Sequence, residues 1–208
     1  MTSTAPGLPG RQAEARRNDE RVLAVARDAL ADEGYDVSMA EIARRAGVGI
    51  GTLYRRYPSK DDLVTAVAIS TMDWAADQAV AAIEAEGEAW SGFVDFLRRC
   101  VEQRPGDLRR LAGRIVSSPE RLAASNRLGE ALGALVEKVK RAGQLRQDVT
   151  AADVYLLLTL MRFPDPALNR RFLAIAVSGL RPDGAGLPEP APSWPDLQRM
   201  WHLEPSSD

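Results

Sequence analysis

Two short apolar segments between Ser38 and Lys60, separated by glycines, constrain the fold of this 208-residue chain more than any other feature. Ser38 followed three places later by Glu41 is a capping box, so a helix is expected to begin directly after Ser38. Gly47 stands where a left-handed residue would end that helix and reverse the chain. Pro58 limits the next helix, because the residue before a proline avoids helical backbone angles. The stretch therefore predicts two short helices joined by a tight turn.

The side chains that point away from the apolar face of this helix pair are suited to binding nucleic acid. Hydroxyl, phenol and guanidinium groups are the usual partners of phosphate oxygens, and a helix-turn-helix places its second helix in the DNA major groove. The seventeen residues from Arg44 to Lys60 contain five basic residues and no acid. A solvated helix face is the alternative interpretation of that charge run. The predicted DNA-contacting residues are Ser38, Arg44, Ile50, Gly51, Thr52, Tyr54, Arg56 and Lys60.

The front of the second helix, Gly49-Ile50-Gly51, offers no side-chain hydrogen bond to a base. Two glycines inside a helix cost about 1 kcal/mol each relative to alanine, which favours a backbone that approaches DNA closely. Drift at an exposed position is the alternative. On the first interpretation, base selection depends on Ile50 against a thymine methyl group, on Arg44 and on DNA shape.

Residues from about Asn18 to Val64 resemble the DNA-binding domain of the TetR/AcrR family of bacterial transcriptional regulators. Three positions depart from the family pattern: Gly49 replaces a frequent serine, Arg56 a frequent histidine, and Ala40 a long polar side chain that reads bases in some members. The segment from Arg104 to Leu145 is similar to an SbtR-like subgroup. The shared motifs are Ile42-Ala43, Ala46-Gly47-Val48, Gly51-Thr52-Leu53-Tyr54 and Pro58-Ser59-Lys60 followed by Asp62-Leu63.

The whole chain is predicted to be all-α with about nine helices, because no alternating strand pattern occurs. Residues 1–17 are expected to form a flexible N-terminal arm whose Arg11, Arg16 and Arg17 reach DNA, with a disordered leader as the alternative. Residues 18–64 would form the helix-turn-helix domain, 65–180 a helical regulatory and dimerisation domain, and 181–208 an irregular tail rich in Pro and Gly. The helices expected after the motif span 59–86, 90–104, 108–116, 119–141, 154–163 and 167–180.

The last two of these helices are apolar around most of their circumference, so either the same chain buries them or a twin subunit covers one side. The resemblance implies the second, because the last two helices of TetR-like proteins form a four-helix dimer bundle. The predicted homodimer interface contains Leu156, Leu160, Leu168, Phe172, Ile175, Ala176 and Gly179.

A ligand pocket is expected in the regulatory domain, although aromatic residues at helical spacing form a packed core more often than a pocket. The predicted pocket residues are Trp74, Trp90, Phe93, Phe96, Leu97, Cys100 and Met161.

The predicted function is that of a sequence-specific DNA-binding regulator, a dimeric repressor that an unknown small-molecule effector releases from a palindromic operator. The net charge of −2 is low for a DNA binder, but residues 11–60 hold ten Lys and Arg against eight Asp and Glu. A helical interaction module, or a small-molecule-binding protein without specific operator binding, is the alternative.

Catalysis is not expected. Cys100 and His202 are the only cysteine and histidine, so neither a metal site, a cofactor nor a histidine-based triad is predicted. The spacing Gly47-x-Gly49-x-Gly51 does not fit a dinucleotide loop. The apolar runs are too short to cross a membrane, the start lacks an export signal, and one cysteine fits a reducing compartment, so a cytoplasmic location is expected.

Overall fold

The computed structural model describes residues 9–103, 115–161, 163, 165–183 and 186–200, and this part of the chain contains helices but no strands. The prediction of an all-α fold is confirmed. A short 3₁₀ helix, Gly34–Asp36, follows the first α-helix. The α-helices are α1 (Pro9–Glu33), α2 (Met39–Ala46), α3 (Ile50–Arg56), α4 (Lys60–Glu84), α5 (Ala89–Glu102), α6 (Pro119–Arg141), α7 (Ala151–Leu160), α8 (Pro166–Gly179) and α9 (Trp194–Met200).

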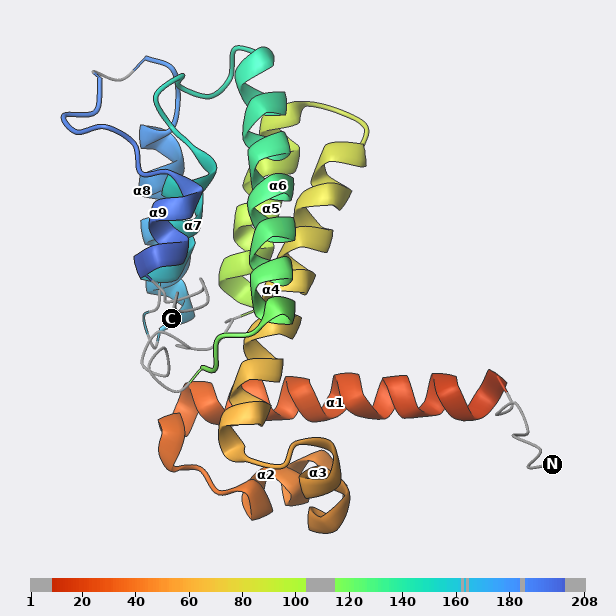
Figure 1. Cartoon of the computed structure of the whole chain (residues 1–208). Coiled ribbons are helices and arrows are strands. Elements are labelled where there is room, and N and C mark those ends of the chain that lie inside the picture. Colours follow the sequence, from red (N-terminus) through yellow and green to blue (C-terminus); the bar gives the residue numbers. More distant parts are fainter. Residues whose placement is uncertain (1–8, 104–114, 162, 164, 184–185, 201–208) are drawn as a thin grey trace.

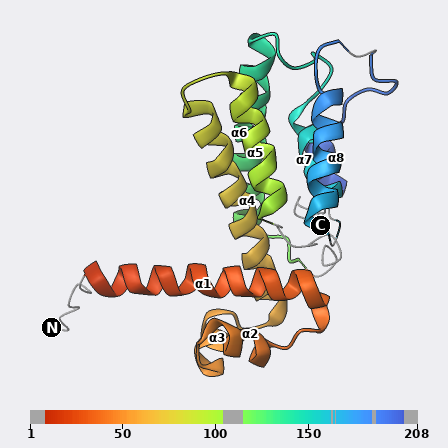
Figure 2. The same ribbon diagram turned by 180° about the vertical axis from the view of Figure 1, so that it is seen from behind.

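The helices form an upper bundle and a lower helix-turn-helix body, and α1 lies between the bundle and helices α2 and α3 (Figure 1). Helices α4, α5 and α6 stand side by side, and α7, α8 and α9 form a second group beside them. Helix α1 crosses the lower end of the bundle and extends well beyond it, while α2 and α3 lie below α1. Figure 2 shows the same arrangement from behind, with α8 on the near side.

Helix α4 connects two separate hydrophobic cores. Its first turns bury Leu63, Val64 and Val67 in the lower core, together with side chains from α1, α2 and α3. Its upper part buries Ala76 and Ala79 in the bundle core, against α5 and α6. Because close-packed cores transmit displacement, a shift of the upper part of α4 would move the lower body as well.

The chain departs from the sequence-based expectations near both ends of the described part. Residues 9–17 were expected to be a flexible arm, but α1 begins at Pro9 and runs through them. Proline is well tolerated in the first turn of a helix, and the following Gln, Ala, Glu and Arg residues are good helix formers even without an apolar stripe. The helix predicted over 108–116 lies outside the described residues except for its last two positions.

The predicted irregular tail contains α9, which packs against α6 and α7. Ser193 and Asp196 form a capping box that starts this helix, with Ser193 N–H donating to Asp196 Oδ2 at 3.1 Å. Gln198 Nε2 donates to Ser125 Oγ at 3.1 Å, and Leu197 is buried. The Trp194 ring meets Tyr155 edge-on, with 5.4 Å between the ring centroids. Helix α9 is therefore a packed part of the regulatory domain.

Gly129 of α6 is expected to be essential for docking α9, because its missing side chain makes room for Trp194. A Cβ atom at Gly129 would lie 2.6 Å from Cε2 of the indole ring. Gly129→Ala should lower the free energy of unfolding by about 1–2 kcal/mol, since overpacking outweighs the gain in helix propensity. Urea unfolding followed by circular dichroism measures this change. Gly133→Ala in the same helix meets no neighbour within 4 Å and should not destabilise; a loss of the same size in both variants would contradict the expectation.

Candidate nucleic-acid interface

The predicted turn between the two short helices is present in detail. Ser38 Oγ accepts a hydrogen bond from Glu41 N–H at 3.1 Å and caps α2. Gly47 has a φ of 68° and ends α2 in the left-handed conformation. Val48 N–H then donates to the Ala43 carbonyl oxygen at 3.0 Å, which closes the reversal. Ser38 is therefore the N-cap of α2, and its contact with DNA stays a prediction.

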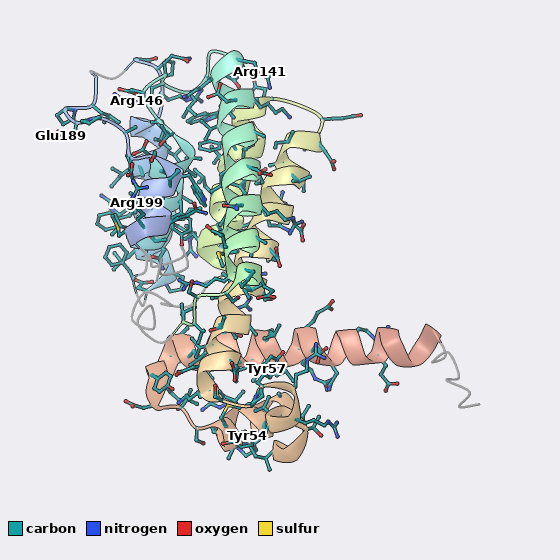
Figure 3. The ribbon with its side chains drawn as sticks, in the orientation of Figure 1. Tyr54, Tyr57, Arg141, Arg146, Glu189 and Arg199 are labelled. Atoms are coloured by element: carbon teal, nitrogen blue, oxygen red, sulfur yellow. The ribbon has the colours of Figure 1, made fainter. Side chains whose placement is uncertain are left out.

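One side of α3 is buried and the other is exposed, as the sequence predicted. Leu53 packs into the lower core against α2. Ile50 and Tyr54 keep 42% and 48% of their surface exposed, and Thr52 is exposed beside them. Tyr54 lies on the lower body, at the end of the molecule away from the helical bundle (Figure 3). Helix α3 therefore presents an apolar, a hydroxyl and a phenol group to solvent over a fixed core.

Among the residues that the structure describes, nothing requires glycine at the front of α3. Gly49 has extended backbone angles and Gly51 is helical, so neither needs a positive φ. A Cβ atom at Gly51 would meet no neighbour within 4 Å, and one at Gly49 would meet only Thr52 Oγ1, at 3.8 Å. Both interpretations, close approach of the backbone to DNA and drift at an exposed position, are compatible with these surroundings.

Arg44 is held in a fixed, exposed orientation by Glu41. The guanidinium donates from Nε to Glu41 Oε2 at 2.8 Å and from Nη2 to Oε1 at 2.7 Å. Arg45 also donates to Glu41 at 2.6 Å and pairs with Glu33 of α1 at 2.5 Å. Hydrogen bonds from Arg44 and then Arg45 lower the pKa of Glu41 to about 2. A bidentate carboxylate contact reduces the rotamer freedom of Arg44, so the side chain is pre-positioned on the exposed surface.

Arg56 and Lys60, both predicted phosphate contacts, bind within the chain. Lys60 Nζ donates to the Tyr35 carbonyl oxygen and lies 4.3 Å from the centroid of the Tyr35 ring. Burial lowers the pKa of Lys60. The ammonium group has two further donors, so a phosphate contact stays a prediction for Lys60. Arg56 pairs with Asp19 of α1 at 2.6 Å but remains exposed, so a phosphate contact stays a prediction for it.

The sequence reasoning missed the role of three acidic residues at this surface. Glu41 was expected to complete a capping box with Ser38, but its carboxylate accepts hydrogen bonds from Arg44 and Arg45. Glu41 lies three and four residues before Arg44 and Arg45, which is the spacing of helical ion pairs and was a usable signal. Asp19 and Glu33 come from a different helix from the arginines they bind, and no local pattern marks them. The Glu33 ion pair therefore connects α2 to α1, and the Asp19 ion pair connects α3 to α1.

The Glu41 contacts lead to a prediction about acid stability. Glu41 has a folded-state pKa of about 2, below its ordinary value of 4.5, so its contribution is present above pH 4.5 and is lost as pH falls towards 2. Glu41→Gln should therefore be less stable than the parent chain at neutral pH, and the difference should shrink on acidification. Urea unfolding at a series of pH values tests this. A difference that stays constant down to pH 2 would show that the carboxylate charge is irrelevant.

The residues predicted to line a ligand pocket lie together in the bundle core. Phe93, Phe96 and Leu97 are fully buried, and Trp90, Cys100 and Met161 are buried with them. Burial raises the pKa of the Cys100 thiol to about 12. The sequence therefore placed these residues together correctly, and their role in lining a ligand pocket stays a prediction. Trp74 is partly buried and, unlike them, also borders a cleft between α1, α4 and α5.

The predicted dimer residues form an exposed apolar surface at one end of α7 and along α8. Leu160 and Ile175 have 64% and 57% of their surface exposed, and Leu168 and Phe172 are exposed as well. Phe172 stacks on Phe163 with 4.7 Å between the ring centroids. Gly179 is exposed, Leu156 is half-buried, and Ala176 is half-buried against the bundle core. We refer to Leu160, Leu168, Phe172 and Ile175 as the α7–α8 apolar surface.

Two family models match successive parts of the chain. Residues 22–67 match "Bacterial regulatory proteins, tetR family", which includes α2 and α3. Residues 85–182 match "Transcriptional regulator SbtR-like, C-terminal domain", from α5 to the end of α8. An HTH-type transcriptional regulator of Staphylococcus aureus is 37% identical over 86 residues, which span 38% of this chain and 42% of that regulator.

Solved structures extend the similarity over most of the chain. A TetR transcription regulatory protein from Mycobacterium vanbaalenii is 36% identical, with a TM-score of 0.64, and the match covers 82% of this chain and 98% of that one. The TetR regulator SCO0520 from Streptomyces coelicolor is 26% identical, with a TM-score of 0.56 over 79% and 99% of the two chains. LfrR from Mycobacterium smegmatis, solved with proflavine, is 22% identical with a TM-score of 0.59 over 84% and 99%, and shares the fold.

Among the described residues, no helix is both long and apolar enough to cross a bilayer. No group of three or more His, Cys, Asp or Glu side chains in the same residues could hold a metal ion.

Proposed function

Because this chain belongs to the TetR family of bacterial transcriptional regulators, we propose that it is a homodimeric repressor which a small molecule releases from a palindromic operator. The observation that carries the proposal is the outward face of α3, where Ile50, Thr52 and Tyr54 are exposed above the buried Leu53. Hydroxyl and phenol groups would contact phosphates, and Ile50 and the pre-positioned Arg44 would contact base edges. We place this activity in the cytoplasm.

Two features support the proposed dimer, namely the size of one recognition helix and the α7–α8 apolar surface. A single α3 of seven residues can read only a few base pairs. A two-fold dimer reads two half-sites separated by about 34 Å or a multiple of it. Four large exposed apolar side chains on α7 and α8 are typical of a surface that a second copy covers.

Release by a ligand is proposed to act through α4, which belongs to both cores. A ligand that binds the regulatory domain shifts the equilibrium only if it binds the DNA-incompetent arrangement more tightly. DNA must then weaken ligand binding by the same factor. The complex of LfrR with proflavine is the reason for proposing a small organic molecule as the effector.

A half-site experiment tests the dimeric repressor. Mobility shift with DNA from upstream of the chain's own gene should locate a palindrome bound by two chains. Replacing one half-site should weaken binding by roughly a hundredfold or more, because several base-pair mismatches cost about 1–3 kcal/mol each. Unchanged affinity for the single half-site would contradict the proposed dimeric binding mode.

Ile50 is expected to contribute sequence discrimination. Ile50→Ala should reduce the preference for one base pair per half-site by about 1 kcal/mol, or about fivefold, because it removes apolar contact with a thymine methyl group. Competition binding with operators changed at single positions measures this preference. Val80→Ala on α4, where the parent side chain is similarly exposed, is the matched control. An equal loss of affinity for all operator sequences would show that Ile50 contributes to binding without selecting a base pair.

A further inference from the structure

Glu41 and Arg44 form a doubly hydrogen-bonded pair on the exposed surface of α2. Nε and Nη2 of Arg44 donate to the two carboxylate oxygens of Glu41, at 2.8 and 2.7 Å. The Arg44 side chain nevertheless keeps 72% of its surface exposed, and that of Glu41 keeps 29%. The pair is therefore held by its own hydrogen bonds and remains open to a partner from outside the chain.

The contact with Glu41 uses one edge of the guanidinium group and leaves another edge free. An arginine has five N–H donors, and Glu41 accepts two of them, one from Nε and one from Nη2. The other three, two on Nη1 and one on Nη2, have no partner among the residues that the structure describes. Because the guanidinium is planar, one N–H of Nη1 and one of Nη2 point outward in parallel. Arg44 thus offers two parallel donors in a fixed direction.

Arg44 is turned away from α1, on the same side of the helix-turn-helix as the exposed part of α3. Its neighbour Arg45 pairs with α1 at 2.5 Å, and Arg56 of α3 pairs with α1 at 2.6 Å. Successive helical residues lie about 100° apart, so Arg44 is rotated from the α1 side of α2, and Tyr54 lies about 200° from Arg56 on α3. Both helices lie below α1 (Figure 1), so Arg44 and Tyr54 are directed away from it together.

Two parallel donors fit a partner with two adjacent acceptors, which in DNA is either a guanine edge or a phosphate. Guanine presents the acceptors N7 and O6 in the major groove, whereas adenine presents one acceptor and one donor there. Glu41 favours guanine, because its carboxylate balances the charge of Arg44 and would repel a phosphate. The neighbouring Arg45 is balanced in the same way by Glu33. A guanine edge carries no net charge and meets no such repulsion.

We propose that Arg44 reads one guanine in each half-site of the operator, and that Glu41 is the positioning residue that directs it. This inference rests on the proposed operator binding and adds to it the base that α2 selects. Glu41 acts through Arg44 alone: it fixes the guanidinium before DNA arrives, so less rotamer freedom is lost on binding. Base selection is then shared between Arg44 of α2 and Ile50 of α3.

Replacing each guanine of the operator in turn by 7-deazaguanine tests the contact at a single atom. This base keeps its Watson–Crick pairing but has C–H in place of the N7 acceptor. In competition anisotropy with the full chain, one such position per half-site should weaken binding by about fivefold, and the loss should vanish in Arg44→Ala. Exchange of the same G·C pair for A·T should weaken binding of the parent chain by about tenfold or more, and binding of Arg44→Ala by about twofold or less.

Glu41→Gln tests the positioning role. It keeps the arginine but should lower the preference for that guanine over adenine by about threefold, because the guanidinium is no longer held through both donors. A merely structural role would weaken binding to every sequence alike, and a ratio of two affinities is unaffected by any unfolded fraction. Arg98→Ala and Asp95→Asn are matched controls, since Arg98 donates to Asp95 at 2.8 Å over the same three-residue spacing in α5. Both controls should keep the guanine preference of the parent chain.

The outcomes separate this inference from the proposed function. A parent chain that binds operator and shuffled DNA equally would contradict both. A parent chain that selects its operator, with an Arg44→Ala variant that loses affinity equally for every substituted operator, would place Arg44 at a phosphate and overturn this inference alone. An unchanged guanine preference in Glu41→Gln would overturn the role of Glu41.

Discussion

Gly51→Glu is expected to abolish operator binding while the chain stays folded. The new side chain would project from the exposed face of α3, where a Cβ atom meets no neighbour within 4 Å. Folding should be unaffected or improved, because a non-glycine residue favours the helix and an acidic group suits its first turn. On DNA, the carboxylate would face phosphates and prevent close approach of the backbone. Such like-charge contact costs several kcal/mol, which weakens binding by roughly a hundredfold or more.

Fluorescence anisotropy with labelled operator measures this loss, and thermal unfolding followed by circular dichroism monitors the fold. Gly133→Glu is the matched control, because it makes the same change in α6 at a glycine with equally open surroundings. Gly133→Glu should bind operator normally. Gly51→Ala should give a smaller loss than Gly51→Glu, because it adds bulk without charge. Normal operator binding by Gly51→Glu would show that α3 does not approach DNA through this face.

Ile175→Glu is expected to convert the proposed dimer to a monomer and thereby weaken operator binding by roughly a hundredfold or more. Ile175 lies on the α7–α8 apolar surface and is largely exposed, so a single folded chain tolerates the charge. In a two-fold dimer, each chain would bury its own new carboxylate without a partner, at a cost of several kcal/mol. Two half-sites can then no longer be held by one stable dimer.

Light scattering after size-exclusion chromatography measures the mass of this variant at micromolar concentration. Val80→Glu places the same charge at an exposed apolar position of α4 and should remain dimeric. A dimer in both variants would mean that the two chains associate through another surface. A monomer that keeps full operator affinity would contradict the link between dimerisation and DNA binding.

The helix-turn-helix was predictable because its determinants are local. Ser38, Gly47 and Pro58 each set a helix end through their own chemistry, and the apolar spacing placed Leu53 inward and Tyr54 outward. The intrachain partners of Arg56 and Lys60 were not predictable, because Asp19 and Tyr35 lie far away in the sequence. Periodicity shows which side of a helix is exposed, but it does not show which distant residue will form an ion pair or a hydrogen bond with an arginine or a lysine.

The sequence predicted most helices of the regulatory half, but it did not predict how those helices pack against one another. Helical spacing correctly gathered Phe93, Phe96 and Leu97 on one face, but the same pattern describes a packed core and a pocket wall equally well. Helix α9 was missed because proline and glycine surround a short segment whose stability comes from tertiary contacts. Trp194 fits over Gly129 of α6, and that complementarity exists only after both elements have folded.

The most direct measurement of the central claim is an anisotropy titration that compares DNA from upstream of the chain's own gene with shuffled DNA of identical length and composition. The upstream DNA should bind two chains per site, about a thousandfold or more tightly than the shuffled DNA at physiological salt. Its affinity should fall with rising salt, with a slope of about −0.9 for each phosphate contact. Equal affinity for the two DNAs would contradict the assignment of this chain as a sequence-specific regulator.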